Sequence, residues 1–238
     1  MDLIKEHWTK QDIADFEKYL LTLSKGKEKG AWEKRIVNTQ LPCIAVPSPA
    51  VNKIVQAIAK GNYLEFIDHW LWNNYTETAI NGKLICKIKD FNMFAWYLTE
   101  YANRADNWAT CDCLIFKINE RNKDHYFALA VDLIKSEKPF VKRVGLNIVM
   151  ALLNFAEYLG SIFAILNSFK DEENYYVNMM VAWLVSVCFV KYRDETLQFL
   201  ETHNLNKFTI NKAISKCHDS FRVAAADKEL LKSFRQTE

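Results

Sequence analysis

The stretch that decides the fold is FVKRVGLNIVMALL, residues 140–153. Its apolar residues recur at helical spacing, and three other segments of the chain follow the same pattern. They are DNWATCDCLIFKI (106–118), YVNMMVAWLVSVCF (176–189) and TINKAISKCHDSF (209–221). Aligned on their apolar residues, they share two columns: Ala109, Val144, Met180 and Ala213, then Cys113, Ile148, Leu184 and Cys217. The intervals along the first column are 35, 36 and 33 residues.

A helix of a second kind precedes each of these segments, after a polar break. The four are DFNMFAWYLTEY (90–101), DHYFALAVDLIKSE (124–137), EYLGSIFAILNSF (157–169) and DETLQFLETHN (194–204). An earlier pair, over 63–74 and 75–88, fits the repeat loosely. One helix pair cannot bury its apolar face alone, so repeated pairs stack and share a core. The sequence therefore predicts an all-α fold, an α-solenoid of HEAT-like antiparallel helix pairs.

We predict a single domain over residues 1–238. Residues 1–60 form a helical N-terminal cap, 61–220 the stacked helix pairs, and 221–238 a C-terminal helix or tail. The cap is expected to run helix, basic turn, loop, helix, because it holds Pro42, Pro47 and Pro49. Its basic residues either bind a polyanion or form an ordinary solvated charge run. They are Lys25, Lys27, Lys29, Lys34 and Arg35.

The composition bounds the class of protein. Half of the residues are hydrophobic and a quarter are charged, which is typical of a globular chain. Only 6 Gly and 4 Pro occur, and this shortage of turn residues favours helices. The net charge of +2 does not by itself indicate a nucleic-acid binder, although charge gathered on one face would be compatible with one.

The cysteines, histidines and apolar runs indicate an intracellular protein without a cofactor. None of the 6 Cys forms a CxxC pair, and no His lies near a Cys at metal-ligand spacing, so we expect free thiols and no metal. The start of the chain is too charged for a signal peptide. The most apolar run, residues 176–190, is too short to span a bilayer, which needs about 20 residues. We expect a buried helix in a soluble, cytoplasmic protein.

Two further columns lie beside the buried ones and are predicted to face the concave groove of the solenoid. The first holds Trp108, Arg143, Met179 and Lys212, and the second holds Asp112, Asn147, Trp183 and Lys216. A carboxylate next to indoles and a guanidinium is partly desolvated, and its charge is available to a cationic group. Basic neighbours can hold phosphates, and tryptophan faces attract flat or cationic groups.

Structural explanations of these residues stay open at this point. Trp183 can be an ordinary packing residue, since large aromatics are mostly buried. Arg143 can pair with Asp112 as a salt bridge between adjacent repeats. The spacing W-x-x-x-D is also common by chance. The shared position of these residues in the repeat favours the groove interpretation.

The chain resembles the AlkD-type DNA alkylation repair proteins, HEAT-like glycosylases that act on alkylated purines. In NWATCDCL (107–114) the tryptophan and aspartate match the family's W-x-x-x-D. FVKRVGLNIV (140–149) matches the segment with its groove arginine, YYVNMMVAWLVSV (175–187) the segment with its second tryptophan, and EKRIVNTQLPCIAVPSPAVNKI (33–54) its N-terminal helix and Pro-containing turn. Two positions depart from the family: Ser186 replaces an arginine, and Ala45 replaces a glycine before the turn.

The resemblance implies a monofunctional glycosylase that hydrolyses the N-glycosidic bond of N3- or N7-alkylpurines in duplex DNA. It implies that Asp112 is catalytic, with Trp108 and Trp183 against the lesion nucleotide and Arg143 on a phosphate. The other expected DNA contacts are Asn147, Lys212, Lys216, Lys27, Lys29, Lys34 and Arg35. We expect a monomer that acts without a cofactor and binds no membrane. The alternatives are a non-catalytic nucleic-acid-binding solenoid and a protein-interaction scaffold.

Overall fold

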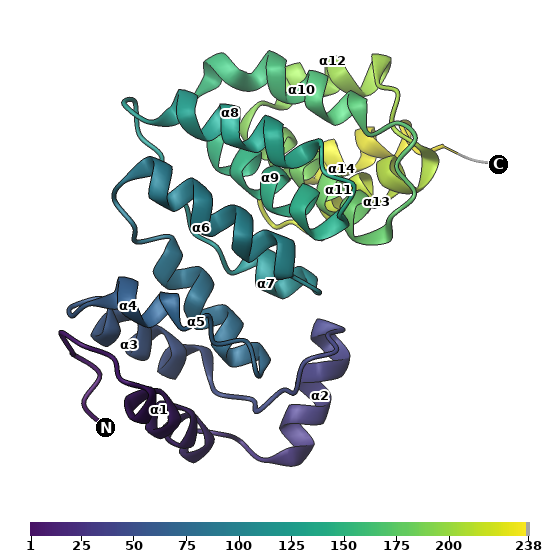
Figure 1. The fold of residues 1–238 in the computed structure, drawn as a ribbon. Coiled ribbons are helices and arrows are strands. Elements are labelled where there is room, and N and C mark those ends of the chain that lie inside the picture. Colours follow the sequence, from purple (N-terminus) through teal and green to yellow (C-terminus); the bar gives the residue numbers. More distant parts are fainter. Residues whose placement is uncertain (237–238) are drawn as a thin grey trace. The chain divides into compact units, whose positions relative to one another are not determined.

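Every regular element of the chain in residues 1–236, the range described by the computed structural model, is a helix (Figure 1). There are fourteen α-helices and one 3₁₀-helix in this range. The predicted all-α fold class is confirmed. The chain divides into two compact units, an N-terminal unit of Met1–Lys117 and a C-terminal unit that begins at Ile118. The prediction of one domain over 1–238 stays a prediction, and residues 237–238 of its C-terminal segment lie outside the described range.

The N-terminal unit is built around α5, which packs on α3, α4, α6 and α7. Nine of the eleven residues of α5 are buried. Trp8 and Phe16 meet Phe66 edge to face, with ring centroids 4.8 and 5.1 Å from that of Phe66, and so bind α1 to α4. The helices are α1 (Lys10–Thr22), α2 (Lys27–Val37), α3 (Ser48–Ile58), α4 (Tyr63–Asp68), α5 (Tyr75–Ile85), α6 (Phe91–Arg104) and α7 (Trp108–Asp112).

The C-terminal unit follows the predicted helix pairs closely. In it α11 packs on α9, α12 and α13, while α8 covers α9 and α14 contacts α13 (Figure 1). All four residues of the first predicted apolar column, one of them in the N-terminal unit, are buried. The elements are α8 (Lys123–Ile134), α9 (Pro139–Leu152), the 3₁₀-helix η1 (Ala156–Tyr158), α10 (Leu159–Ser168), α11 (Tyr175–Lys191), α12 (Arg193–Thr202), α13 (Lys207–Asp219) and α14 (Ala225–Lys232).

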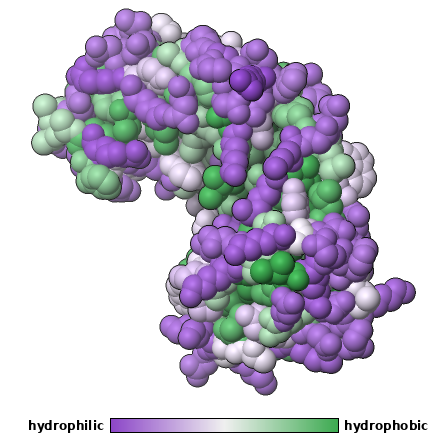
Figure 2. All heavy atoms as spheres, turned by 90° about the vertical axis from the view of Figure 1, so that its left-hand side faces the viewer, coloured by the Kyte–Doolittle hydropathy of each residue, from purple (hydrophilic) through white to green (hydrophobic). Residues whose placement is uncertain are grey.

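The most apolar segment of the sequence forms α11 and is covered by other helices on most sides. Within the described residues, no helix has the length and hydropathy that crossing a membrane requires. On the face drawn in Figure 2, hydrophilic side chains predominate and hydrophobic surface is confined to patches. The apolar residues of the chain therefore serve mainly to pack helices against one another.

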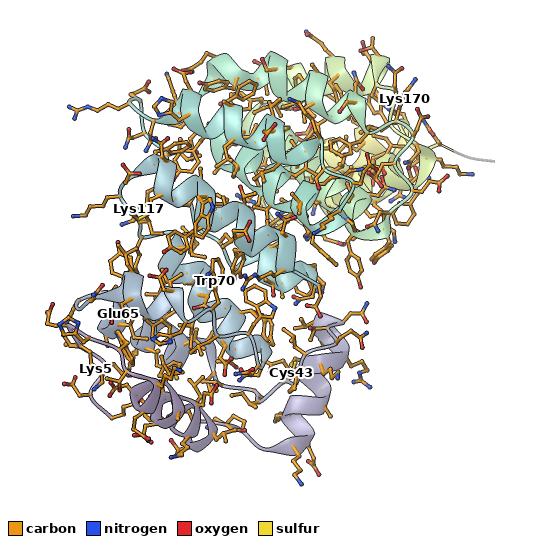
Figure 3. The ribbon with its side chains drawn as sticks, in the orientation of Figure 1. Lys5, Cys43, Glu65, Trp70, Lys117 and Lys170 are labelled. Carbon is orange, nitrogen blue, oxygen red and sulfur yellow. The ribbon has the colours of Figure 1, made fainter. Side chains whose placement is uncertain are left out.

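The basic segment of the cap is a helix, α2, where the sequence predicted a turn and a loop. Gly26 precedes it with a φ of 87°, in the left-handed region that favours glycine. Gly30 faces the segment that carries Cys43, labelled in Figure 3. A Cβ at Gly30 would lie 2.3 Å from the Cys43 carbonyl oxygen. The prediction was wrong because glycine in this helix serves close packing, which a local pattern cannot distinguish from a turn.

The helix that carries Trp108 and Asp112 is shorter than predicted. The sequence predicted a helical segment over 106–118, whereas α7 ends at Asp112. The buried Tyr101 hydroxyl donates to the Thr110 carbonyl at 3.1 Å. If the helix continued, the Thr110 carbonyl would accept a hydrogen bond from the backbone amide of Leu114. That amide donates instead to the Cys111 carbonyl, with 3.5 Å between nitrogen and oxygen. A side chain from α6 thus competes for the acceptor that the next turn would need.

Candidate functional site

The start of α7 is held by the side chain of Asn107. This residue is fully buried, and its side-chain oxygen Oδ1 accepts a hydrogen bond from the backbone amide of Thr110 at 2.8 Å. Its amide group donates to the Thr110 hydroxyl and to the Asp106 carboxylate. An asparagine at this position satisfies amides that the helix leaves unpaired. Trp108 and Asp112 therefore lie on one face of a well-anchored turn.

The Trp108 side chain ties α7 to the basic helix. Its indole nitrogen donates to the carbonyl of Ile36 at 3.2 Å, and the side chain is half-buried. Asp106 makes a second tie, accepting the Thr39 hydroxyl at 2.7 Å and the Gln40 amide at 2.8 Å. The end of α2 is thus fixed against the start of α7. The sequence had indicated for Trp108 a contact with nucleic acid but no structural bond.

Asp112 is half-buried and belongs to a polar cluster of the N-terminal unit. Burial raises the pKa of Tyr75, and charges nearby, those of Glu33 and Asp112 among them, raise it further. The Glu33 carboxylate accepts the Ala45 amide at 2.9 Å, and burial raises its pKa. The Tyr75 amide donates to the Pro42 carbonyl at 3.0 Å. Charges on α2 and α7 therefore both act on Tyr75 at the start of α5.

Tyr75 and Glu33 were missed by the sequence prediction. For Tyr75 the signal was present, because it directly follows Asn74, the N-cap of α5. Trp108 follows the N-cap Asn107 in the same way, and Tyr175 follows Asn174. An aromatic residue after an N-cap asparagine is thus a further feature of several of these helices. No local sequence pattern could have identified Glu33, because only the tertiary fold brings α2 close to Tyr75.

Ala45 adopts a backbone conformation that favours glycine. Its φ is 51°, in the left-handed region that L-residues rarely occupy. Its amide is held by Glu33, and its carbonyl accepts the Lys25 amide at 3.2 Å. Two hydrogen bonds, one to a residue just before α2 and one to a side chain of α2, thus hold a strained residue in place.

Arg143 on α9 is only 5% exposed. Its guanidinium Nη1 donates to the carbonyl of Tyr176 at 2.6 Å, which joins α9 to α11 within the C-terminal unit. A charged group at this depth needs such partners, because burial of an unpaired charge is costly. The structure thus assigns Arg143 a structural bond, and its contact with a phosphate stays a prediction.

Trp183 on α11 is more exposed than Trp108, the other tryptophan of the predicted site. Of the whole residue's surface, 37% is accessible to solvent. Ser186 stands where the family has an arginine. Its side chain is buried and donates back to the Trp183 carbonyl at 2.7 Å. Ser186 therefore serves the helix backbone.

The remaining predicted contacts fall on helix surfaces. Lys212 is exposed on α13, and its Nζ lies 5.6 Å from the ring centroid of Phe208, within cation–π distance. Lys216 and Asn147 are half-buried. The basic residues of α2 are exposed, and Lys34 also donates to the Gln40 carbonyl at 3.2 Å.

The predicted residues divide between the units. Trp108, Asp112 and the basic residues of α2 belong to the N-terminal unit, where Trp108 bonds to the last turn of α2. The others belong to the C-terminal unit; they are Arg143, Asn147, Trp183, Lys212 and Lys216. That all of them line one groove stays a prediction.

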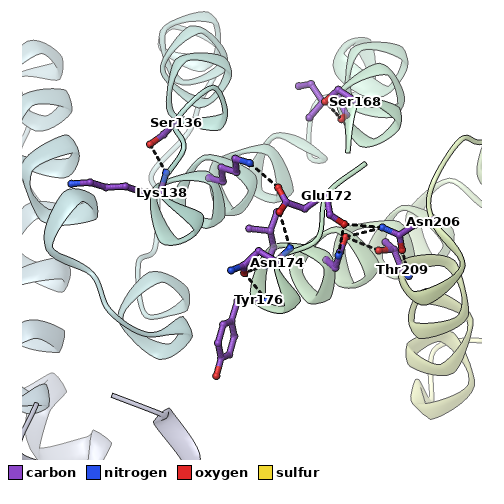
Figure 4. Close-up of polar contacts among 12 residues, drawn as sticks. Ser136, Lys138, Ser168, Glu172, Asn174, Tyr176, Asn206 and Thr209 are labelled. Atoms are coloured by element: carbon purple, nitrogen blue, oxygen red, sulfur yellow. Dashed lines mark hydrogen bonds and ion pairs between the residues drawn. The ribbon is translucent and has the colours of Figure 1, made fainter. Parts of the chain in front are cut away.

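A polar network fixes the starts of α11 and α13 (Figure 4). The Glu172 carboxylate accepts Lys142 Nζ at 2.7 Å and the Asn174 amide at 2.9 Å. Its backbone carbonyl accepts the side-chain amides of Asn178 and Asn206. Beside it lies an open depression of about 590 Å³. This depression holds none of the predicted site residues, and it mixes Asp171, Glu172 and Glu173 with two lysines, so its charge does not favour a polyanion.

Comparisons with known proteins identify the family. A family model described as DNA alkylation repair enzyme matches residues 18–217, which cover both units. No curated protein and no solved structure matches the chain.

Proposed function

The chain belongs to the DNA alkylation repair enzyme family, and from this premise we propose that it is a DNA glycosylase for alkylated purines. The resemblance stated from the sequence is confirmed by the family match. The protein is thus an enzyme of DNA alkylation repair. The proposal is that it hydrolyses the N-glycosidic bond of N3- and N7-alkylpurines in duplex DNA, without cutting the strand.

The observation that carries the proposal is the half-buried carboxylate of Asp112, one turn from Trp108 on a helix with no other charged residue. Alkylation at N3 or N7 makes a purine cationic and therefore a good leaving group. As the glycosidic bond breaks, positive charge develops on the sugar, as in other glycoside hydrolyses. A carboxylate in a site partly shielded from water stabilises that charge better than bulk water does.

In this mechanism the side chains have separate tasks. Asp112 stabilises the sugar cation and orients the water that attacks it. Trp108 and Trp183 pack against the sugar and backbone of the lesion nucleotide. α7 itself carries no lysine, and in the proposed reaction water attacks the sugar without a Schiff base, which leaves an abasic site in an intact strand. Tyr75 lies in the electrostatic range of Asp112.

Binding of the duplex depends on the cations assigned to phosphate contacts. In the N-terminal unit these lie on α2, which is tied to α7 through Trp108 and Asp106. In the C-terminal unit they include Lys212, which is exposed on α13. Each phosphate contact releases counterions, so affinity falls with salt. Arg143 is only 5% exposed, so its contribution to phosphate binding is the smallest of these.

The test is single-turnover release of 7-methylguanine from methylated duplex DNA. Asp112→Asn keeps the shape of the side chain and removes its charge. We expect the rate to fall about 100-fold, since an electrostatic contribution of roughly 3 kcal/mol is lost, while the melting temperature stays unchanged. The matched control is Asp132→Asn, an exposed carboxylate on α8, which should release base at the wild-type rate.

Two results would contradict the proposal. A wild-type rate in the Asp112→Asn variant would remove Asp112 from the chemistry. Duplex binding by the wild-type protein without any base release would indicate a non-catalytic binding protein.

A further inference from the structure

The outward face of α2 carries two large apolar side chains. Trp32 is 55% exposed and Ile36 is 48% exposed. They stand four residues apart, which places them side by side on one face of the helix. The opposite face of α2 is the packed one, with Gly30 and Val37 buried. Trp32 and Ile36 therefore project away from the core of the N-terminal unit.

Cations flank this apolar pair. Lys29 stands three residues before Trp32 and Arg35 three residues after it, so both are its neighbours on the helix surface. Both side chains are exposed. Glu28 is the acidic residue on the same face. The face thus presents an indole between two positive charges.

Trp32 differs from most other tryptophans of the chain. Trp8, Trp70, Trp72 and Trp96 each pack against another aromatic ring. In the part of the chain that the structure describes, the Trp32 ring has no such aromatic partner. The fold therefore gives no packing reason for so large an exposed ring, and such rings are enriched where proteins bind partners.

The pair is also fixed relative to the proposed catalytic helix. The carbonyl of Ile36 accepts the Trp108 indole at 3.2 Å, and Asp106 holds Thr39 and Gln40 just beyond the end of α2. A ligand bound on the outward face of α2 would therefore have a fixed position relative to α7. All of these contacts lie within the N-terminal unit.

We infer that α2 grips duplex DNA, with Trp32 and Ile36 against sugars and base edges of the minor groove and Lys29 and Arg35 on the flanking phosphates. The inference rests on the proposed function and adds an apolar contact to it. Charge complementarity selects the occupant, because a polyanion satisfies the cations on both sides of the indole. Apolar wedges between phosphate contacts are a known means of engaging the minor groove.

The test compares Trp32→Ala with Trp96→Ala in binding an unmodified duplex. Trp96 is the matched control, being 56% exposed on α6 in the same unit. We expect Trp32→Ala to lower affinity about tenfold, the effect typical of losing one aromatic contact with nucleic acid. The slope of log affinity against log salt should not change, because no cation is removed. Lys29→Ala should instead flatten that slope by about 0.9.

A second variant keeps the test decisive. Trp32→Phe keeps an aromatic ring and changes no charge, so it should bind more tightly than Trp32→Ala. Binding of Trp32→Ala equal to that of Trp96→Ala, or binding of Trp32→Phe as weak as that of Trp32→Ala, would overturn the inference. So would a dimer of the wild-type chain in sedimentation that Trp32→Ala abolishes, since the face would then contact a second copy.

The outcome is separable from the proposed function. Base release by wild type and by Trp32→Ala at saturating enzyme reports on the chemistry, and duplex affinity reports on α2. Normal release with unchanged affinity in Trp32→Ala would refute only the inference. Failure of wild type to bind a duplex would refute the inference, and absence of base release would refute the proposed function.

Discussion

Both units contain hydrogen bonds that span about one repeat, such as that between Thr78 and Thr110 over 32 residues in the N-terminal unit, but the N-terminal unit adds bonds of about twice that reach. In the C-terminal unit, Arg143 bonds to Tyr176 and Thr209 to Asn178, over 33 and 31 residues, which is about one repeat. In the N-terminal unit, Asp106 bonds to Thr39 over 67 residues and Trp108 to Ile36 over 72. The C-terminal unit is therefore a periodic stack. The N-terminal unit joins segments two repeats apart, and it is where the polar cluster around Asp112 forms.

The sharpest test of this contrast is Arg143→Ala in the periodic stack. The change removes a buried charged donor and leaves the Tyr176 carbonyl without it. We expect a loss of about 3 kcal/mol in unfolding free energy, at the upper end for a charged hydrogen bond, measured by chemical denaturation. Lys212→Ala, an exposed cation on α13, is the control and should leave stability unchanged.

The opposite pattern would restore the interpretation made from sequence. If Arg143→Ala left stability unchanged and flattened the salt slope of DNA binding by about one unit, Arg143 would act mainly on a phosphate.

Asp106→Asn tests the long-range tie of the N-terminal unit. The carboxylate accepts bonds from Thr39, Gln40 and Asn107. An amide has one acceptor oxygen and presents an NH₂ group toward donors, so we expect a loss of about 2 kcal/mol. Because α2 is then less firmly tied to α7, duplex affinity should fall as well.

The control for this change is Asp132→Asn on the surface of α8, which should alter neither stability nor affinity. Unchanged affinity in a destabilised Asp106→Asn variant would show that α2 does not need its tie to α7 for binding.

Ala45→Gly is the smallest of the expected effects and has the opposite sign. The φ of 51° strains alanine, and glycine relieves the strain at some cost in backbone entropy. We expect stability to rise by roughly 0.5 kcal/mol, seen as a higher melting temperature. Ala50→Gly, in the helical backbone of α3, should lower it instead. A fall in both variants would mean that the turn at Ala45 is not strained.

Periodic features were predictable from the sequence. The spacing of Ala109, Val144, Met180 and Ala213 predicted their burial, because a helix repeats every 3.6 residues whatever surrounds it. The same spacing located α8 to α13 to within a few residues. The pattern W-x-x-x-D led to the family, which the match over residues 18–217 confirms.

Other features were decided by the tertiary structure alone. The close approach of Gly30 on α2 to Cys43 and the bond from the Tyr101 hydroxyl to the Thr110 carbonyl on α7 both join segments far apart in the sequence or on different helices. The burial of Arg143 and the grouping of Glu33 with Tyr75 also arise only in the fold. The physical reason is one of range. Helical periodicity is set by neighbours within a turn or two. Which side chain donates a hydrogen bond to a carbonyl of another segment depends instead on packing between parts of the chain dozens of residues apart.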